Sequence, residues 1–320
     1  MSSSGPGLRK SERSTDFRAP RIVRRAISGV VLLDKPAGLS SSAACQRVKR
    51  LYRAESAGHT GTLDPFATGL LPIALGEATK FSSGLLGADK TYETHARLGI
   101  RTDTGDLDGA VVAERPTTHD AAALAAALAR LAAAVLQVPP MYSALKRDGR
   151  PLYEYARAGL VVERAARPMT IHSLDLLSAT ESALHLRIRC SKGTYIRTLI
   201  DDLGEMLGCG AHLTALRRTA IGSIDLGRAR ALGDIEILGE DALDRLLDPP
   251  DSLVGTYPAI ALDDTATSKL VLGQTVSTEP PILGKSVLMR AYDPTGKFLG
   301  VVQRQDDGRI KPERLVRTGV

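Results

Sequence analysis

The sequence predicts an α+β fold: a mixed, largely antiparallel central sheet with flanking helices, followed by a small C-terminal β-barrel domain. Helix-like and strand-like runs are both present, but they do not alternate in the regular order of βαβ units. Near Pro249 and Pro250 the chain changes to short strand-like runs divided by turn signals, which is typical of a separate β domain. A length of 320 residues, 43% of them hydrophobic, is sufficient for two domains with buried cores.

The N-terminal residues 1–26 are predicted to form a disordered basic tail, because they are rich in Ser, Arg and Gly and have no apolar periodicity. Seven Lys/Arg and two Asp/Glu give this tail a net charge of +5. The whole chain has a net charge of +6, so the remainder is nearly neutral. Charge alone therefore does not identify a nucleic-acid partner.

The first ordered elements are expected from Ile27 onward. The apolar run in "ISGVVLLDKP" indicates a buried strand that ends at Pro36. Three serines, Ser40 to Ser42, can cap a helix whose apolar residues recur at helical spacing: Cys45, Val48, Leu51 and Tyr52. Strict alternation in "TYETHARLGI" predicts a strand with one face formed by Tyr92, Thr94, Ala96, Leu98 and Ile100.

The next elements follow from composition and periodicity. Alanine predicts a helix in "THDAAALAAALARLAAAVLQ", and alternation predicts a strand in "ALHLRIRC". The turn "SKGT" leads into a helix with a buried stripe of Ile196, Leu199, Leu203 and Leu207. Strands of the C-terminal domain are expected in "SVLMRAY" and "KFLGVVQRQ", on either side of a turn from Asp293 to Gly296.

Several classes of protein and site are excluded by what the sequence lacks. No run of eighteen apolar residues indicates a membrane helix, and the polar N-terminus has no secretion signal. Cys45, Cys190 and Cys209 have neither disulfide-framework nor zinc spacing, which favours a cytoplasmic location. Phosphate-loop, G-x-S-x-G and H-E-x-x-H motifs are absent, and "DTGDLDG" has the wrong residues for a calcium loop. No cofactor and no metal are expected.

One carboxylate stands out, because Asp64 is the only acid in "GHTGTLDPFATGLLP". It is either part of an Asp-Pro turn or a nucleophile or base held on a stiff loop. Other residues have equally plain structural interpretations: Tyr92 as a core aromatic, and Arg197 as a partner of Asp201 one helical turn away. His59 could simply brace the turn, so no single residue decides the function.

The motifs taken together resemble the tRNA pseudouridine synthase B family in order and spacing. They are "DKPAGLSS", "GHTGTLDPFATGLLPIALGEATKF", "KTYETHARLGIRTDTGDLDG", "QVPPMYSALKRDGRPLYEYARAG" and "KGTYIRTLIDDLGEMLGCGAHLTALRRTAIG". The resemblance covers residues 27–225 densely and continues loosely to "GRIKPERLV". It implies a pseudouridine synthase fold and isomerisation of uridine 55, in the T loop of tRNA, by base flipping.

The resemblance also implies roles for individual residues. Asp64 would be the essential carboxylate, as nucleophile or base, with Arg197 as its charge partner. Tyr92 would stack on the flipped base, and its hydroxyl would help to remove the C5 proton. The other expected pocket residues are Leu216 as an apolar wall, His59 in the space left by extruded nucleotides, and Lys35, Lys80 and Tyr195 as supports.

By the same resemblance, residues 27–249 would be the catalytic domain, with a mobile flap at 116–159 that grips the T loop through Lys146, Arg147 and Arg150. Residues 250–320 would form a PUA-like RNA-binding domain for the acceptor end of tRNA. The expected protein is a monomer with no obligate protein partner. Three alternatives stay open: a guide-RNA-dependent synthase of the same superfamily, an RNA-folding chaperone and a carboxylate-dependent hydrolase.

Overall fold

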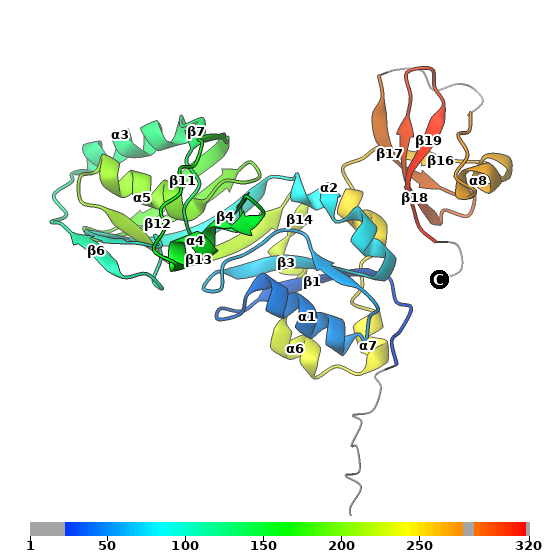
Figure 1. Cartoon of the computed structure of the whole chain (residues 1–320), viewed down its shortest axis with the longest axis horizontal. Helices are drawn as coiled ribbons and strands as arrows, with labels where there is room; N and C mark the ends of the chain where they lie inside the picture. Colours follow the sequence, from blue (N-terminus) through cyan, green and yellow to red (C-terminus); the bar gives the residue numbers. More distant parts are fainter. Residues whose placement is uncertain (1–22, 278–284, 318–320) are drawn as a thin grey trace, which may run out of the picture.

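A nine-stranded mixed sheet forms the centre of the protein in the computed structural model, which describes residues 23–277 and 285–317 (Figure 1). The strand order is β11-β12-β4-β13-β3-β1-β15, with β14 paired to β13 and β2 paired to β3. Only the pairs β13–β3 and β1–β15 are parallel. The predicted mixed, largely antiparallel sheet is confirmed.

The strands of this sheet are β1 (Gly29–Lys35), β2 (Ala57–His59), β3 (Thr68–Leu75), β4 (Lys90–Leu98), β11 (Ile171–Ala179), β12 (Ala183–Cys190), β13 (Ala211–Ile221), β14 (Ile224–Asp225) and β15 (Arg230–Ala231). The helices around it are α1 (Ser41–Leu51), α2 (Ser83–Leu86), α3 (Ala121–Ala132), α4 (Leu152–Arg157), α5 (Ile196–Met206), α6 (Leu232–Glu236) and α7 (Glu240–Asp244). Three 3-10 helices are η1 (Gly76–Phe81), η2 (Leu226–Arg228) and η3 (Pro250–Val254).

The helices cover the sheet in two groups (Figure 1). α3 and α5 lie on one face of the β11-β12-β4-β13 half, whereas α1, α6 and α7 lie near β1 and β3. One large core joins both groups, with Val48 from α1, Leu124 from α3 and Leu199 from α5 among its buried residues. A second core on β1 and β3 includes Phe81 and Val254.

The local predictions hold for the main elements. Ser40 caps α1 by accepting a hydrogen bond from the Ala43 N–H at 3.1 Å, and Asp120 caps α3. In β4, every second residue from Lys90 to Leu98 is buried, as the alternation predicts. Two ends differ: Ile100 belongs to a separate short strand, β5 (Ile100–Thr102), and Leu207 is the residue that ends α5. In both cases a neighbouring glycine with positive φ, Gly99 or Gly208, interrupts the regular backbone.

Smaller elements connect the sheet halves. β5 pairs with β6 (Val111–Glu114) in a hairpin. Beyond α3 come β7 (Leu136–Gln137), β8 (Lys146–Arg147), β9 (Arg150–Pro151) and β10 (Arg167–Pro168). Within the predicted flap at 116–159, α3 packs against α5 and contributes Leu124, Ala127 and Leu131 to the main core. Beyond α3, the segment still contains a few buried residues, among them Gln137, Ser143 and Leu152.

The C-terminal part is a four-stranded sheet in the order β16-β17-β18-β19, with helix α8 (Asp264–Val271) beside it. Its strands are β16 (Ala259–Ala261), β17 (Val287–Tyr292), β18 (Phe298–Arg304) and β19 (Ile310–Leu315). Among residues 23–277 and 285–317 no pairing joins β16 to β19, so closure of the expected barrel is not seen there. The ring centroids of Phe81 and Phe298 lie 5.1 Å apart where this sheet meets the larger one.

The N-terminal segment meets the larger unit before Ile27. Residues 1–22 of the predicted tail lie outside the described part of the chain. The Arg25 N–H donates to the Arg53 carbonyl at 2.9 Å, and the Arg25 guanidinium binds Asp244. Ordered contacts therefore begin before Ile27, where the apolar pattern starts. The backbone and the side chain of Arg25 make them, so an apolar pattern could not predict them.

No helix in the described residues is both long enough and apolar enough to span a bilayer.

Candidate active site

The Asp64 loop connects β2 to β3 and is fixed at several points. Its Leu63 N–H donates to the Ser41 hydroxyl at 2.7 Å, and that hydroxyl donates back to the Leu63 carbonyl at 2.9 Å. The carbonyl of Pro65 accepts hydrogen bonds from the Gly38 N–H at 2.9 Å and from Lys35 Nζ at 3.2 Å. The loop is therefore attached to both the end of β1 and the start of α1, which limits its motion.

The charge partner of Asp64 is Arg197. Arg197 Nε lies 2.9 Å from Asp64 Oδ2, and the Arg197 side chain is almost entirely buried. The competing partner suggested by helical spacing, Asp201, pairs instead with Arg101, whose Nε lies 2.6 Å away. The structure thus supports the pair inferred from the resemblance, because Arg197 at the start of α5 points toward the β2–β3 loop.

Arg197 also binds two further segments of the chain. Its Nη1 donates to the Thr104 carbonyl at 3.0 Å, and its Nη2 donates to the Tyr142 carbonyl at 2.7 Å. A second carboxylate, that of Asp106, is buried and has its Oδ2 3.6 Å from Arg197 Nη1. One guanidinium therefore serves two carboxylates and two backbone carbonyls.

Burial and neighbouring charges set the ionisation of Asp64. Burial raises the pKa of its carboxyl, and the Asp106 charge acts in the same direction. The Arg197 guanidinium opposes this rise in pKa by favouring the ionised form. Lys35 faces the same loop, and burial lowers its pKa to about 8, against the influence of Asp64.

Tyr92 and Arg218 lie opposite each other on β4 and β13. Tyr92 is buried, and burial raises the pKa of its phenol while Arg218 opposes that rise. Arg218 is 1% exposed and donates to the carbonyls of Leu70 at 2.8 Å, Gly61 at 3.1 Å and Thr62 at 3.3 Å. It therefore holds the chain on both sides of Asp64 and also contacts the tyrosine.

Three other predicted residues lie on the elements that surround Asp64. Leu216 is a buried residue of β13, opposite Thr94 of β4. Tyr195 precedes α5, and its backbone N–H and carbonyl bind the side-chain amide of Gln137 at 2.8 and 3.1 Å. His59 ends β2, and its buried Nδ1 has no hydrogen-bond partner. Burial, and then the Arg218 charge, lowers the pKa of His59.

The two predicted lysines have different surroundings. Lys35 is fully buried, and its Nζ donates to the carbonyls of Pro36, Leu39 and Pro65. The contact with Pro65 attaches it to the loop that carries Asp64. Lys80 is not brought to this group: its Nζ binds Glu77 at 2.6 Å and the Leu315 carbonyl at 3.0 Å. Its expected role as a pocket support is corrected, because η1 directs it toward the C-terminal sheet.

Sequence reasoning missed Arg218, Asp106 and Gln137. Arg218 lies inside the quoted motif "AHLTALRRTAIG", where it resembles a surface arginine beside Arg217. Asp106 lies in "DTGDLDG", within a motif that carries the resemblance, but its carboxylate has no individual role there except as a rejected calcium ligand. Within the described ranges, no group of three His, Cys, Asp or Glu side chains could hold a metal ion.

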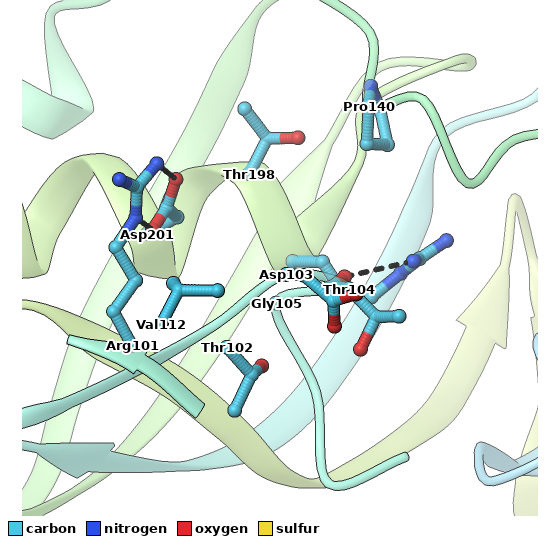
Figure 2. Close-up of a pocket in the computed structure, with 10 residues that line it drawn as sticks. Arg101, Thr102, Asp103, Thr104, Gly105, Val112, Pro140, Thr198 and Asp201 are labelled. Atoms are coloured by element: carbon cyan, nitrogen blue, oxygen red, sulfur yellow. Dashed lines mark hydrogen bonds and ion pairs between the residues drawn. The ribbon is translucent and has the colours of Figure 1, made fainter. Parts of the chain in front are cut away.

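A hollow of about 180 Å³ lies beside Arg197 (Figure 2). Figure 2 shows the Arg101–Asp201 pair on one side of it and the loop from Thr102 to Gly105 on the other. Thr198 and Pro140 complete its wall. The Thr104 loop therefore lies between open space and the guanidinium that holds Asp64.

Three family models match this chain, and all three describe pseudouridylate or pseudouridine synthases, so the chain is a member of that enzyme class. Residues 49–196 match the N-terminal domain of the TruB family of pseudouridylate synthases. Residues 197–255 match the C-terminal domain of tRNA pseudouridylate synthase B, and residues 258–316 match the C-terminal model of pseudouridine synthase II TruB.

Full-length relatives identify the family within that class. The chain is 52% identical over 304 residues to tRNA pseudouridine synthase B of Burkholderia mallei, covering 94% of this chain and 97% of the relative. It is 53% identical over 313 residues to the protein of that name from Cupriavidus metallidurans, covering 95% and 99%. The chain belongs to the tRNA pseudouridine synthase B (TruB) family.

Solved structures share the fold at lower identity. A chain of the archaeal box H/ACA sRNP Nop10-Cbf5 complex superposes with a TM-score of 0.67 at 22% identity, covering 90% of this chain and 85% of that one. A chain of a Cbf5-Nop10-Gar1 complex gives 0.68 at 23% identity, covering 90% and 84%. The predicted fold class is confirmed by these neighbours.

Proposed function

We propose that this protein isomerises uridine 55 in the T loop of tRNA to pseudouridine, with Asp64 as the essential carboxylate. The tRNA substrate is supported by relatives at 52–53% identity that carry the name tRNA pseudouridine synthase B. One observation carries the role of Asp64: a half-buried carboxylate on a fixed loop, paired at 2.9 Å with the buried guanidinium of Arg197. Such an arrangement keeps a reactive charge in position without a cofactor.

The reaction rearranges one nucleotide and adds or removes no atom overall. The bond from ribose C1′ to uracil N1 breaks, the uracil turns in the pocket, and a bond from C1′ to C5 forms. The proton on C5 is then lost and N1 gains one. The ionised carboxylate of Asp64 acts either as the nucleophile that holds the ribose or base, or as the base that takes the 2′ proton. Arg197 favours that ionised form.

The pocket proposed for the flipped uracil is largely apolar. Tyr92 stacks on the base and Leu216 closes the wall opposite, since both are buried on adjacent strands. The phenol of Tyr92 has a raised pKa and stays protonated near neutral pH, so its hydroxyl relays the C5 proton by exchange rather than as a phenolate. His59 occupies the space left in the T loop, with a lowered pKa that keeps it uncharged.

The larger unit, residues 27–249, is proposed as the catalytic domain, and residues 250–320 as a PUA-like domain that holds the acceptor end. The segment at 116–159 is proposed to grip the T loop, with movement confined to the part beyond α3 because α3 packs in the core. Three buried free cysteines support a reducing compartment, the cytoplasm. The enzyme is proposed to act as a monomer without a guide RNA.

Tritium release from tRNA labelled at uracil C5 tests the proposal. The purified protein and tRNA alone should release tritium, and the product should map to position 55. Asp64→Asn should release none while binding tRNA within a few fold of the wild type. Binding without release by the wild type would favour the RNA-chaperone alternative, and release that requires a guide RNA would favour the guided synthase. Full activity of Asp64→Asn would exclude the proposed role of Asp64.

A further inference from the structure

A second hollow, of about 140 Å³, lies at the β1–β15 edge of the large sheet. Its inner wall is apolar and includes Val31 and Leu32 of β1 and Ile235 of α6. Its charged lining consists of Arg228, Arg230, Arg245 and Asp248. We call it the arginine hollow; no role has been given to it in the reaction proposed above.

The charges in the arginine hollow do not balance. Arg228 is paired, because its Nη2 lies 2.8 Å from both carboxylate oxygens of Asp248. Arg230 and Arg245 make no side-chain hydrogen bond or ion pair with any residue in the described part of the chain. Three arginines against one aspartate leave a net charge of +2 around one cavity.

The position of Arg230 and that of Arg245 each have a simpler explanation, but these explanations do not account for both side chains lining one hollow. Arg230 lies on the short edge strand β15, where a charge discourages pairing with another sheet. Arg245 ends α7, where a cation favours the helix terminus. Neither effect requires the two guanidinium groups to line the same hollow as Arg228. Because the three arginines are exposed, water screens their mutual repulsion, so they can share one hollow and still present free N–H donors to an anion.

We propose that the arginine hollow binds a phosphate group through Arg230 and Arg245. Guanidinium groups present planar pairs of N–H donors that match phosphate oxygens, and two of them suit a doubly charged group or consecutive phosphates. The phosphate belongs either to the RNA substrate or to a small phosphate-bearing molecule.

The position of the hollow favours the RNA as the source. Leu32 precedes Lys35 by three residues on β1, which corresponds to about 10 Å along a strand. Lys35 in turn holds the carbonyl of Pro65, next to Asp64. The hollow is therefore within reach of an RNA strand that has one nucleotide at Asp64. The inference that the phosphate belongs to RNA rests on the proposed function. The inference that the hollow binds a phosphate does not.

The test compares the double variant Arg230→Gln/Arg245→Gln with a matched control, Arg187→Gln/Arg189→Gln on β12. Both variants lose two positive charges from exposed side chains of the larger unit. The dependence of tRNA affinity on salt is measured for each, together with thermal unfolding in pyrophosphate at constant ionic strength. Each phosphate contact contributes about 0.7–0.9 to the slope of log affinity against log salt.

Either source predicts a distinct result. An RNA phosphate predicts that the slope falls by about 0.7–2 in the Arg230/Arg245 variant alone, while tritium release at saturating tRNA is unchanged. A small ligand predicts that pyrophosphate raises the melting temperature of the wild type and the control but not of the Arg230/Arg245 variant. Equal slopes together with equal pyrophosphate responses in all three proteins would overturn the proposal. Because both readouts measure binding, they remain valid if the wild type releases no tritium.

Discussion

Replacing Arg197 with methionine should move the pH dependence of the reaction to higher pH. The substitution keeps an unbranched side chain but removes the charge that lies 2.9 Å from Asp64. With charge centres about 4 Å apart and an effective dielectric constant near 20, the lost attraction is about 4 kcal/mol. Burial and Asp106 then raise the pKa of Asp64 against the weaker opposition of Lys35 alone. A change of 4 kcal/mol corresponds to a factor of about 1,000 in ionisation.

The assay is single-turnover tritium release at saturating tRNA between pH 6 and pH 9. At pH 7 the rate constant of Arg197→Met should be below that of the wild type, by at most about 10³-fold, and it should rise with pH, by at most about tenfold per pH unit, until Asp64 is ionised. Arg187→Met is the control, since Arg187 pairs with Glu93 on the exposed side of β4 and β12. An equally slow Arg197→Met reaction at every pH would refute ionisation control and leave only a positional role.

Three further predictions concern neighbouring residues. Asp106→Asn removes a charge that raises the pKa of Asp64, so the pH–rate profile should shift toward acid, opposite to Arg197→Met; an unshifted profile would contradict this. His59 has a folded pKa below its ordinary 6.5, so only the unfolded chain gains a proton as the pH falls through 6.5, and stability is lost there. The stability of His59→Gln, measured by urea unfolding at pH 7.5 and 5.5, should lack that loss; parallel behaviour would show that His59 is protonated in the fold. Gly69→Ala should destabilise the protein by about 2–4 kcal/mol, because φ is +102° and a Cβ would lie 2.3 Å from the Arg218 carbonyl oxygen. Gly87→Ala, with no atom within 4 Å of the added Cβ, is its control in the same unfolding experiment.

The regular elements could be predicted from sequence because their signals are local. Alternation identifies β4 and β12, and the caps Ser40 and Asp120 identify the starts of α1 and α3. The sequence could not show whether the C-terminal strands close into a barrel, because closure depends on a pairing between distant strands.

The site was predicted unevenly for a related reason. The resemblance predicts the pair of Asp64 and Arg197. Helical spacing instead suggests Asp201 as the partner of Arg197, and the structure pairs Asp201 with Arg101. Arg218 was missed because nothing in "LRR" distinguishes the buried arginine from its partly exposed neighbour Arg217. Lys80 was misplaced because its partner, the Leu315 carbonyl, lies 235 residues away in the chain. Burial and long-range partners are properties of the folded chain.

The contact between Arg218 and Leu70 joins residues 148 positions apart, and this has a consequence during synthesis. At about 5–20 residues per second, roughly 7–30 s pass between the appearance of Leu70 and that of Arg218. Until then the strand that follows Asp64 lacks the guanidinium that holds its carbonyl. A nascent chain that stops before Arg218 therefore carries the carboxylate but not its scaffold, so catalytic competence is acquired only after about two thirds of the polypeptide has been made.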